Sequence, residues 1–262
     1  MSSLEKSYIR KSISVSTAPD NVIRQDCSLA QVWTADVMTL FPDSFPGVLG
    51  QSLTGRALRM GTWELSITDL RPFGEGKHKN VDDTPAGGGA GMVLRADVIG
   101  KAIDHVLDQG KKSKPLVFLS PRGRVFDQHL ANEWAKGPGI ILLAGRFEGV
   151  DQRVIDHYGI QEISLGDFVM SGGEIAAQAM IDACVRLLPG VIGNSASLED
   201  ESHKNGLLEH PQYTKPHKWK GRIIPDVLLS GNHQKIDEWR RSEAEALTKS
   251  RRPDLWKAHK AR

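Results

Sequence analysis

Two hydrophobic periods alternate along the chain between residues 32 and 190. Strand-like runs, either apolar throughout or alternating with polar residues, occupy 32–41, 62–70, 115–120, 139–145 and 160–165. Helical spacing, with apolar residues three or four positions apart, occurs within 42–61, 96–110, 126–136, 151–159 and 174–190. Strands that alternate with helices predict an α/β domain with a largely parallel sheet over residues 31–190.

The two ends of the chain lack this alternation. Residues 1–30 are rich in serine and have no sustained period, which predicts a disordered N-terminal extension. An organellar transit peptide is the alternative, but Glu5 and Asp20 count against it. Residues 191–212 are polar and predict an interdomain linker. Residues 213–262 predict a small all-helical domain of two or more amphipathic helices.

Composition places the protein in a broad class. Of the 262 residues, 39% are hydrophobic and 25% charged, which is ordinary for a soluble globular protein. No apolar run approaches the roughly 20 residues that cross a bilayer, so no membrane partner is expected. The start of the chain lacks the features of a secretory signal. Cys27 and Cys184 have no metal-ligand spacing and suggest a reducing compartment. A cytoplasmic location is predicted.

Charge is distributed unevenly along the chain. Residues 213–262 contain 13 lysines and arginines against 6 acidic residues, a balance of +7, whereas residues 1–212 have a balance of −5. A basic segment attached to a mildly acidic one predicts a polyanionic partner, most simply a nucleic acid. A solvated helical face with internal ion pairs is the alternative.

Several common catalytic and ligand-binding motifs are missing. The sequence contains no G-x-G-x-x-G after the first predicted strand and no G-x-x-x-x-G-K-[ST], so neither a dinucleotide fold nor a P-loop is indicated. It also lacks H-E-x-x-H, C-x-x-C and G-x-S-x-G. The nine histidines are scattered and predict no metal site.

Three glycine-rich loops instead follow consecutive predicted strands. They are "SPRGR" at 120–124, "GRFEGVD" at 145–151 and "GDFVMSGG" at 166–173. Because parallel strands end at one edge of a sheet, these loops should share an edge where ligands of α/β folds bind. Any one loop is an ordinary turn in most proteins, but three in succession favour a cavity.

Five motifs give the chain a specific resemblance. "VDDTPAGGGAGM", "LSPRGR", "AGRFEGVDQRV", "GDFVMSGGE" and "GLLEHPQYTKP" followed by "VLLSGNH" resemble the bacterial tRNA (guanine-N1-)-methyltransferase family, TrmD, over residues 32–256. The resemblance implies a homodimer of the SPOUT class with a C-terminal trefoil knot in its α/β domain. It implies S-adenosylmethionine as methyl donor, tRNA as partner, and 1-methylguanosine at position 37, 3′ of the anticodon, as product.

The resemblance also implies which residues bind the methyl donor. All lie in the three glycine-rich loops or in the strands that lead into them. They are Phe118, Leu119, Ser120, Pro121, Gly123, Gly145, Phe147, Glu148, Leu165, Gly166, Asp167, Phe168, Val169, Met170, Gly172 and Gly173. Apolar flanks and backbone groups suit adenine, and a carboxylate such as Glu148 or Asp167 suits a sulfonium.

Methylation of guanine N1 requires two further groups. An acid must remove the N1 proton, and a cation must balance the charge that develops on O6. By resemblance, Arg186 is the cation and an acid in the following linker is the base. The family pattern Asp-Ser-Phe reads Glu201-Ser202-His203 here, so the base is either Glu201 or Asp200.

Other departures and alternatives stay open. Ala86 stands where many members have tyrosine, and Arg122 where many have glutamine. A Mg²⁺ requirement is left open, because no metal-ligand spacing occurs in the sequence. The competing functions are a related RNA methyltransferase that acts on a ribose 2′-hydroxyl or another base, and a non-enzymatic RNA-binding protein with a vestigial cavity.

Overall fold

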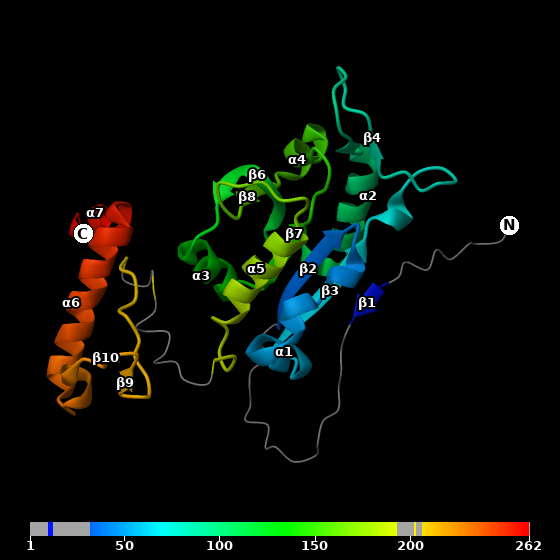
Figure 1. Cartoon of the computed structure of the whole chain (residues 1–262). Coiled ribbons are helices and arrows are strands. Elements are labelled where there is room, and N and C mark those ends of the chain that lie inside the picture. The colour runs from blue at the N-terminus through cyan, green and yellow to red at the C-terminus, as the bar shows by residue number, and fades with distance from the viewer. Residues whose placement is uncertain (1–9, 13–31, 193–201, 203–205, 262) are drawn as a thin grey trace, which may run out of the picture. The chain divides into compact units, whose positions relative to one another are not determined.

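The structure is a computed structural model that describes residues 10–12, 32–192, 202 and 206–261. Contacts divide the chain into two compact units, Met1–Ile192 and Gly193–Arg262 (Figure 1). The first contains the alternating strands and helices, and the second contains the basic C-terminal segment. Among the described residues, no helix combines the length and apolar character needed to cross a bilayer.

A six-stranded sheet forms the centre of the first unit. Its strand order is β1-β3-β2-β7-β6-β8. The strands are β1 (Arg10–Ser12), β2 (Trp33–Thr39), β3 (Trp63–Asp69), β6 (Leu116–Val125), β7 (Gly139–Leu143) and β8 (Gln161–Ser164). All neighbours from β3 to β8 pair in parallel, which confirms the predicted α/β class and its parallel sheet.

Helices cover both faces of this sheet (Figure 1). One apolar core contains side chains of α1 (Ser52–Arg59), α3 (Gln128–Lys136) and α5 (Glu174–Val185). The other contains side chains of α2 (Ala96–Val106) and α4 (Gln152–Tyr158). Strand β7 supplies both cores, because alternate residues of a strand point to opposite faces. Its uniformly apolar sequence is the pattern expected of a strand buried on both sides.

The edge strand β1 differs from the sequence-based expectation. Residues 1–30 were expected to contain no regular element, yet Arg10–Ser12 pairs antiparallel with Ser66–Thr68 of β3. Without this strand, β3 would present unpaired backbone groups at the sheet edge, and pairing satisfies them. The rest of the expected extension lies outside the described residues.

The second unit is only partly helical. Helices α6 (His233–Arg251) and α7 (Pro253–Lys260) lie within the segment where helices were expected. Two short strands, β9 (Lys218–Trp219) and β10 (Arg222–Ile223), also form an antiparallel hairpin, so the expectation of an all-helical segment is corrected. Two-residue strands are too short to show a period in the sequence.

Candidate active site

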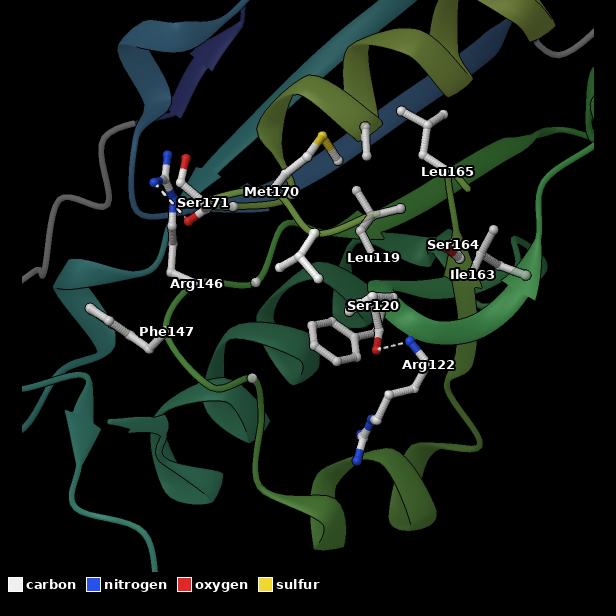
Figure 2. Close-up of a pocket in the computed structure, with 18 of the residues that line it drawn as sticks. Leu119, Ser120, Arg122, Arg146, Phe147, Ile163, Ser164, Leu165, Met170 and Ser171 are labelled. Carbon is white, nitrogen blue, oxygen red and sulfur yellow. Dashed lines mark hydrogen bonds between the residues drawn. The ribbon is translucent and has the colours of Figure 1, made fainter. Parts of the chain in front are cut away.

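The three glycine-rich loops meet at one edge of the sheet. They follow β7 and β8 or belong to the end of β6, and together they surround a cavity of about 200 Å³ (Figure 2). The carboxyl ends of neighbouring parallel strands lie at the same edge, which is where ligands of open α/β folds bind. The first helical turn of α5 completes the wall through Ala176.

The segment "SPRGR" is an irregular part of β6 and not a loop after it. The pairing of β6 with β8 shifts between Leu119 and Arg124, and both residues pair with Ile163. The four residues between them therefore bulge out of the ladder. Figure 2 shows Leu119 and Ser120 beside the cavity on this curved strand. An ideal Cβ on Gly123 would lie 2.3 Å from the Glu162 carbonyl carbon, so glycine permits this close approach.

A backbone contact joins the loop after β7 to the start of α5. The Gly173 N–H donates to the Gly145 carbonyl oxygen at 3.0 Å. Gly145 itself lies against an aromatic ring, because a Cβ there would be 2.4 Å from Cε2 of Phe118. Phe118 is 3% exposed and lines the same cavity. The width of the cavity therefore depends on glycine at position 145.

The fourth glycine-rich stretch, "TPAGGGAGM", contacts the loop after β7. The Glu148 N–H donates to the Met92 carbonyl at 2.9 Å, and the Leu94 N–H donates to the Gly149 carbonyl at 2.9 Å. Gly91 has a left-handed backbone (φ 88°), and a Cβ there would lie 2.5 Å from the Glu148 side chain. Glycine therefore lets this segment pack directly on Glu148, a carboxylate of the cavity wall.

Arg146 links the cavity to the end of β2. Its guanidinium forms an ion pair with the buried Glu174 carboxylate at 2.9 Å. It also donates a hydrogen bond to the Ser171 carbonyl at 3.1 Å, which Figure 2 shows. Glu174 also accepts a 2.7 Å hydrogen bond from the Thr39 hydroxyl. The guanidinium carbon lies 4.3 Å from the centre of the Phe41 ring. Arg146 Nε is buried and has no acceptor among the described residues.

Most residues that the resemblance implies for the methyl donor line this cavity. Three do not: Gly123, Gly166 and the exposed Asp167 are sequence neighbours of the wall. Of the two carboxylates considered for a sulfonium, Glu148 is the one that borders the cavity. The thirteen lining residues are Phe118, Leu119, Ser120, Pro121, Gly145, Phe147, Glu148, Leu165, Phe168, Val169, Met170, Gly172 and Gly173.

Seven residues of the wall were not predicted from the sequence. They are Arg122, Arg146, Gly149, Ile163, Ser164, Ser171 and Ala176. Each lies within three positions of a predicted residue, so extending each motif by a few positions would have found them. Arg122 also forms an ion pair with Glu162 at 2.9 Å. Arg122 therefore contributes a charge pair beside the cavity.

Arg186, the expected cation, does not line the cavity. Arg186 follows the C-terminal end of α5, whereas the cavity borders the N-terminal end of that helix. Ala176 of the cavity wall and Arg186 are ten positions apart in the sequence, which is about 15 Å along a helix at 1.5 Å per residue. The two candidate bases, Glu201 and Asp200, lie outside the described residues.

Two other side chains of the first unit, those of Cys184 and Tyr158, have raised pKa values. Burial raises the pKa of the Cys184 thiol to about 12, so it stays protonated. Burial and a hydrogen bond to Asp104 raise the pKa of Tyr158 to about 12. Within the described ranges, no group of three or more histidine, cysteine, aspartate or glutamate side chains is placed to hold a metal ion.

These features define a class of protein. A parallel sheet with a glycine-walled cavity at its strand ends, together with a basic C-terminal unit, is typical of an α/β protein that binds a small cofactor and a polyanion. The chain belongs to the family described as tRNA (Guanine-1)-methyltransferase TrmD, whose model matches residues 33–258. The resemblance stated from the motifs is therefore confirmed.

Curated relatives match nearly the whole chain. A tRNA (guanine-N(1)-)-methyltransferase of Ruegeria sp. (strain TM1040) is 66% identical over 234 residues, 89% of this chain and 96% of the relative. A protein of the same name from Cereibacter sphaeroides (strain KD131) is 62% identical, covering 88% and 94% of the two chains. A third, from Mesorhizobium japonicum, is 58% identical, covering 86% and 97%.

Proposed function

We propose that the protein transfers a methyl group from S-adenosylmethionine to N1 of the guanine 3′ of the anticodon, position 37, in tRNA. The convergence of the glycine-rich motifs on one cavity carries this proposal. Membership of the TrmD family and the activity for which its relatives are named support guanine N1 in tRNA as the acceptor. Position 37 rests on the resemblance alone.

The cavity fits the proposed donor. Apolar side chains of Leu119, Ile163 and Leu165 provide flanks for adenine, and the glycine-rich backbone provides hydrogen-bonding groups for its edge. Glu148 supplies a carboxylate that attracts the positive sulfonium. When bound, the donor supplies an electrophilic methyl group, and the surrounding residues orient it and exclude water.

The acceptor chemistry assigns roles to three residues of this chain. Neutral guanine N1 is a poor nucleophile, so Glu201 or Asp200 removes its proton as the methyl group arrives. Arg186 balances the negative charge that develops on O6. The long separation between Arg186 and the cavity of its own chain supports a homodimer, in which Arg186 and the linker acid serve the partner's cavity.

Two further features complete the proposal. The strand ends around the cavity would form the trefoil knot of the SPOUT class, with the donor held against its backbone. The basic second unit would bind tRNA. A related methyltransferase acting on a ribose hydroxyl would share the cavity, but it would need neither the linker acid nor a guanine at one defined position.

Methyl transfer to paired tRNA transcripts tests the proposal. We expect methylation of a transcript with guanine 3′ of the anticodon and none when that base is adenine. Nucleoside analysis of the product should show 1-methylguanosine. A 2′-O-methylated nucleoside, or methylation that ignores the base, would transfer support to the related methyltransferase.

A further inference from the structure

The hairpin β9–β10 carries an exposed aromatic ring between two cations. Trp219 is 59% exposed, whereas Trp33, Trp63 and Trp134 are each less than 5% exposed, and Trp239 and Trp256 are half-buried. Trp219 pairs directly across the hairpin with Arg222, so both side chains lie on the same face. The Lys220 ammonium lies 5.0 Å from the centre of the Trp219 ring. One face thus presents an indole flanked by two positive charges.

The turn of this hairpin places a lysine where the backbone disfavours one. Lys220 and Gly221 both have positive φ, 46° and 80°. A two-residue turn of this kind prefers asparagine, aspartate or glycine at its first position, because other side chains are strained there. The Ile224 N–H donates to the His217 carbonyl at 3.1 Å and closes the base of the hairpin. The strained position holds a cation at the exposed tip.

The hairpin cations lack local counter-charges. Among the residues that the structure describes, no carboxylate forms an ion pair with Lys218, Lys220 or Arg222. Helix α6 differs, since its Arg240 and Arg241 pair with Asp237 at 3.4 Å and with Glu245 at 3.2 Å. Part of the basic charge on that helix is therefore neutralised within the protein, whereas the charge of the hairpin is available to a partner.

We propose that the β9–β10 hairpin is an RNA-contact surface, with Trp219 stacking on an unpaired base of the tRNA and Lys220 and Arg222 contacting adjacent phosphates. Exposed aromatic rings stack on splayed bases, and flanking cations hold the backbone beside them. This inference rests on the proposed function, since it takes tRNA as the substrate. It adds a surface that the basic composition of residues 213–262 did not identify.

Lys220→Gly separates a contact role from a structural role. Glycine suits the positive φ better than lysine, so the variant hairpin should be at least as stable as the original. We nevertheless expect weaker tRNA binding. The slope of log K against log salt concentration should also fall in magnitude by about one, because one phosphate contact is lost. A lysine that only shaped the turn would give the opposite result, with unchanged or improved binding.

Trp219→Ala tests the stacking contact. We expect the Kd for tRNA to rise about tenfold, with the salt dependence unchanged, because stacking releases no counterions. Trp219→Phe should restore most of the affinity. Matched controls in the full-length protein are Leu229→Ala, which removes another exposed apolar side chain of the second unit, and Lys136→Ala, which removes an exposed cation of the first unit. Neither should change the Kd for tRNA.

Equilibrium binding of a tRNA transcript at several salt concentrations, with methyl transfer on the same samples, decides the outcome. If the parent protein methylates guanine but Lys220→Gly and Trp219→Ala bind tRNA like the parent, the hairpin proposal is wrong and the proposed function stands. If these variants change the oligomeric state and keep their affinity for tRNA, the hairpin binds another copy of the chain. If the parent transfers no methyl group to guanine, the proposed function itself falls.

Discussion

At the scale of single residues, the shape of the cavity depends on glycines, which have no side chain. An ideal Cβ on Gly145 would lie 2.4 Å from the ring of Phe118, and an ideal Cβ on Gly172 would lie 2.2 Å from Nε of Arg146. Both neighbours line the cavity. Close packing leaves no room for an added methyl group unless such a neighbour moves. These glycines therefore set where the wall side chains lie, as well as making room for a ligand.

Gly145→Ala should impair binding of the methyl donor. The new methyl group would push the end of the Phe118 ring, and the space that this ring borders is the cavity. Overpacking of this kind costs about 1–3 kcal/mol, so we expect the Kd for S-adenosylmethionine to rise about 10- to 100-fold. Calorimetric titration of the folded variant measures it. Gly137→Ala is the control, because a Cβ at that position makes only an ordinary 3.5 Å contact. An unchanged Kd of the Gly145→Ala variant for S-adenosylmethionine would contradict the assignment of the cavity.

Residue types could be predicted from the sequence, but their partners could not. The glycine-rich motifs indicated the loops of the cavity before the structure was known. The partners of Asp36 were not predictable, because this buried carboxylate in β2 pairs with Lys111 and, at 2.7 Å, with Lys114. Such long-range pairs depend on how the helix and loop after α2 pack on the sheet, and local periodicity carries no information about that packing.

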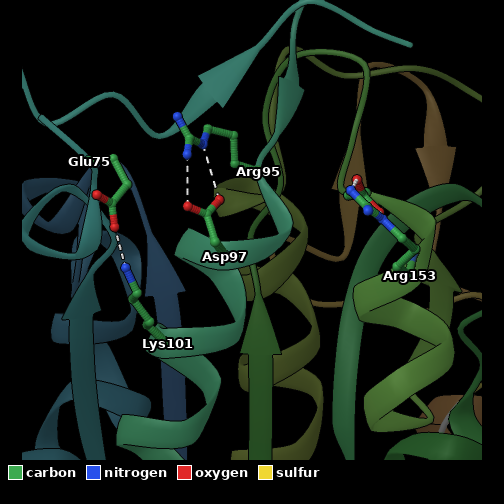
Figure 3. Close-up of polar contacts among 6 residues, drawn as sticks. Glu75, Arg95, Asp97, Lys101 and Arg153 are labelled. Atoms are coloured by element: carbon green, nitrogen blue, oxygen red, sulfur yellow. Dashed lines mark hydrogen bonds and ion pairs between the residues drawn. The ribbon is translucent and has the colours of Figure 1, made fainter.

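At the scale of elements, the start of α4 is fixed by one carboxylate. Asp151 caps the helix by accepting a 2.9 Å hydrogen bond from the Arg153 N–H, and its carboxylate also accepts two hydrogen bonds from the Arg153 guanidinium. Figure 3 shows Arg153 at the beginning of this helix. Hydrogen bonding by the Arg153 side chain lowers the pKa of Asp151, and burial opposes this shift in part. Helix α4 follows directly on the cavity loop, so this cap also fixes where that loop ends.

Asp151→Ala should destabilise the protein in a pH-dependent way. Loss of a helix cap costs about 1 kcal/mol at neutral pH. Because the folded pKa is below the unfolded value of about 3.9, the charge-dependent stabilisation is complete above that value and disappears as pH falls through the folded pKa. Urea unfolding across this range measures the free-energy difference. Asp151→Asn keeps an acceptor for the Arg153 N–H, so a loss as large as that of alanine would show that charge, not capping, dominates.

Strands and helices of the first unit were predictable where burial was continuous. The apolar run of β7 is buried along its whole length, and a short continuous apolar run is what a strand buried on both faces requires. The irregular end of β6 and the hairpin β9–β10 were missed for a different reason. Their backbone depends on a bulge and a tight turn, and neither of these produces a hydrophobic period.

At the scale of the whole molecule, one chain places its cavity and its Arg186 at opposite ends of one helix. The cavity lies at the N-terminal end of α5 and Arg186 follows its C-terminal end. A twofold dimer resolves this separation if each chain contributes its cavity to one site and its Arg186 to the other. Two composite sites then result from two identical chains.

Mixing two impaired variants should therefore restore activity when the donor concentration is too low to saturate the Gly145→Ala cavity. In a dimer of one Gly145→Ala chain and one Arg186→Ala chain, one site has both defects, and the other combines an intact cavity with an intact arginine. Random assortment makes about half of the dimers mixed, so the mixture should recover up to about a quarter of the parent activity. Single-turnover methyl transfer on saturating tRNA, measured after the dimers have exchanged chains, gives the value. A mixture no more active than its two components would place Arg186 and the cavity in the same site of one chain, and α5 would then have to move before methyl transfer.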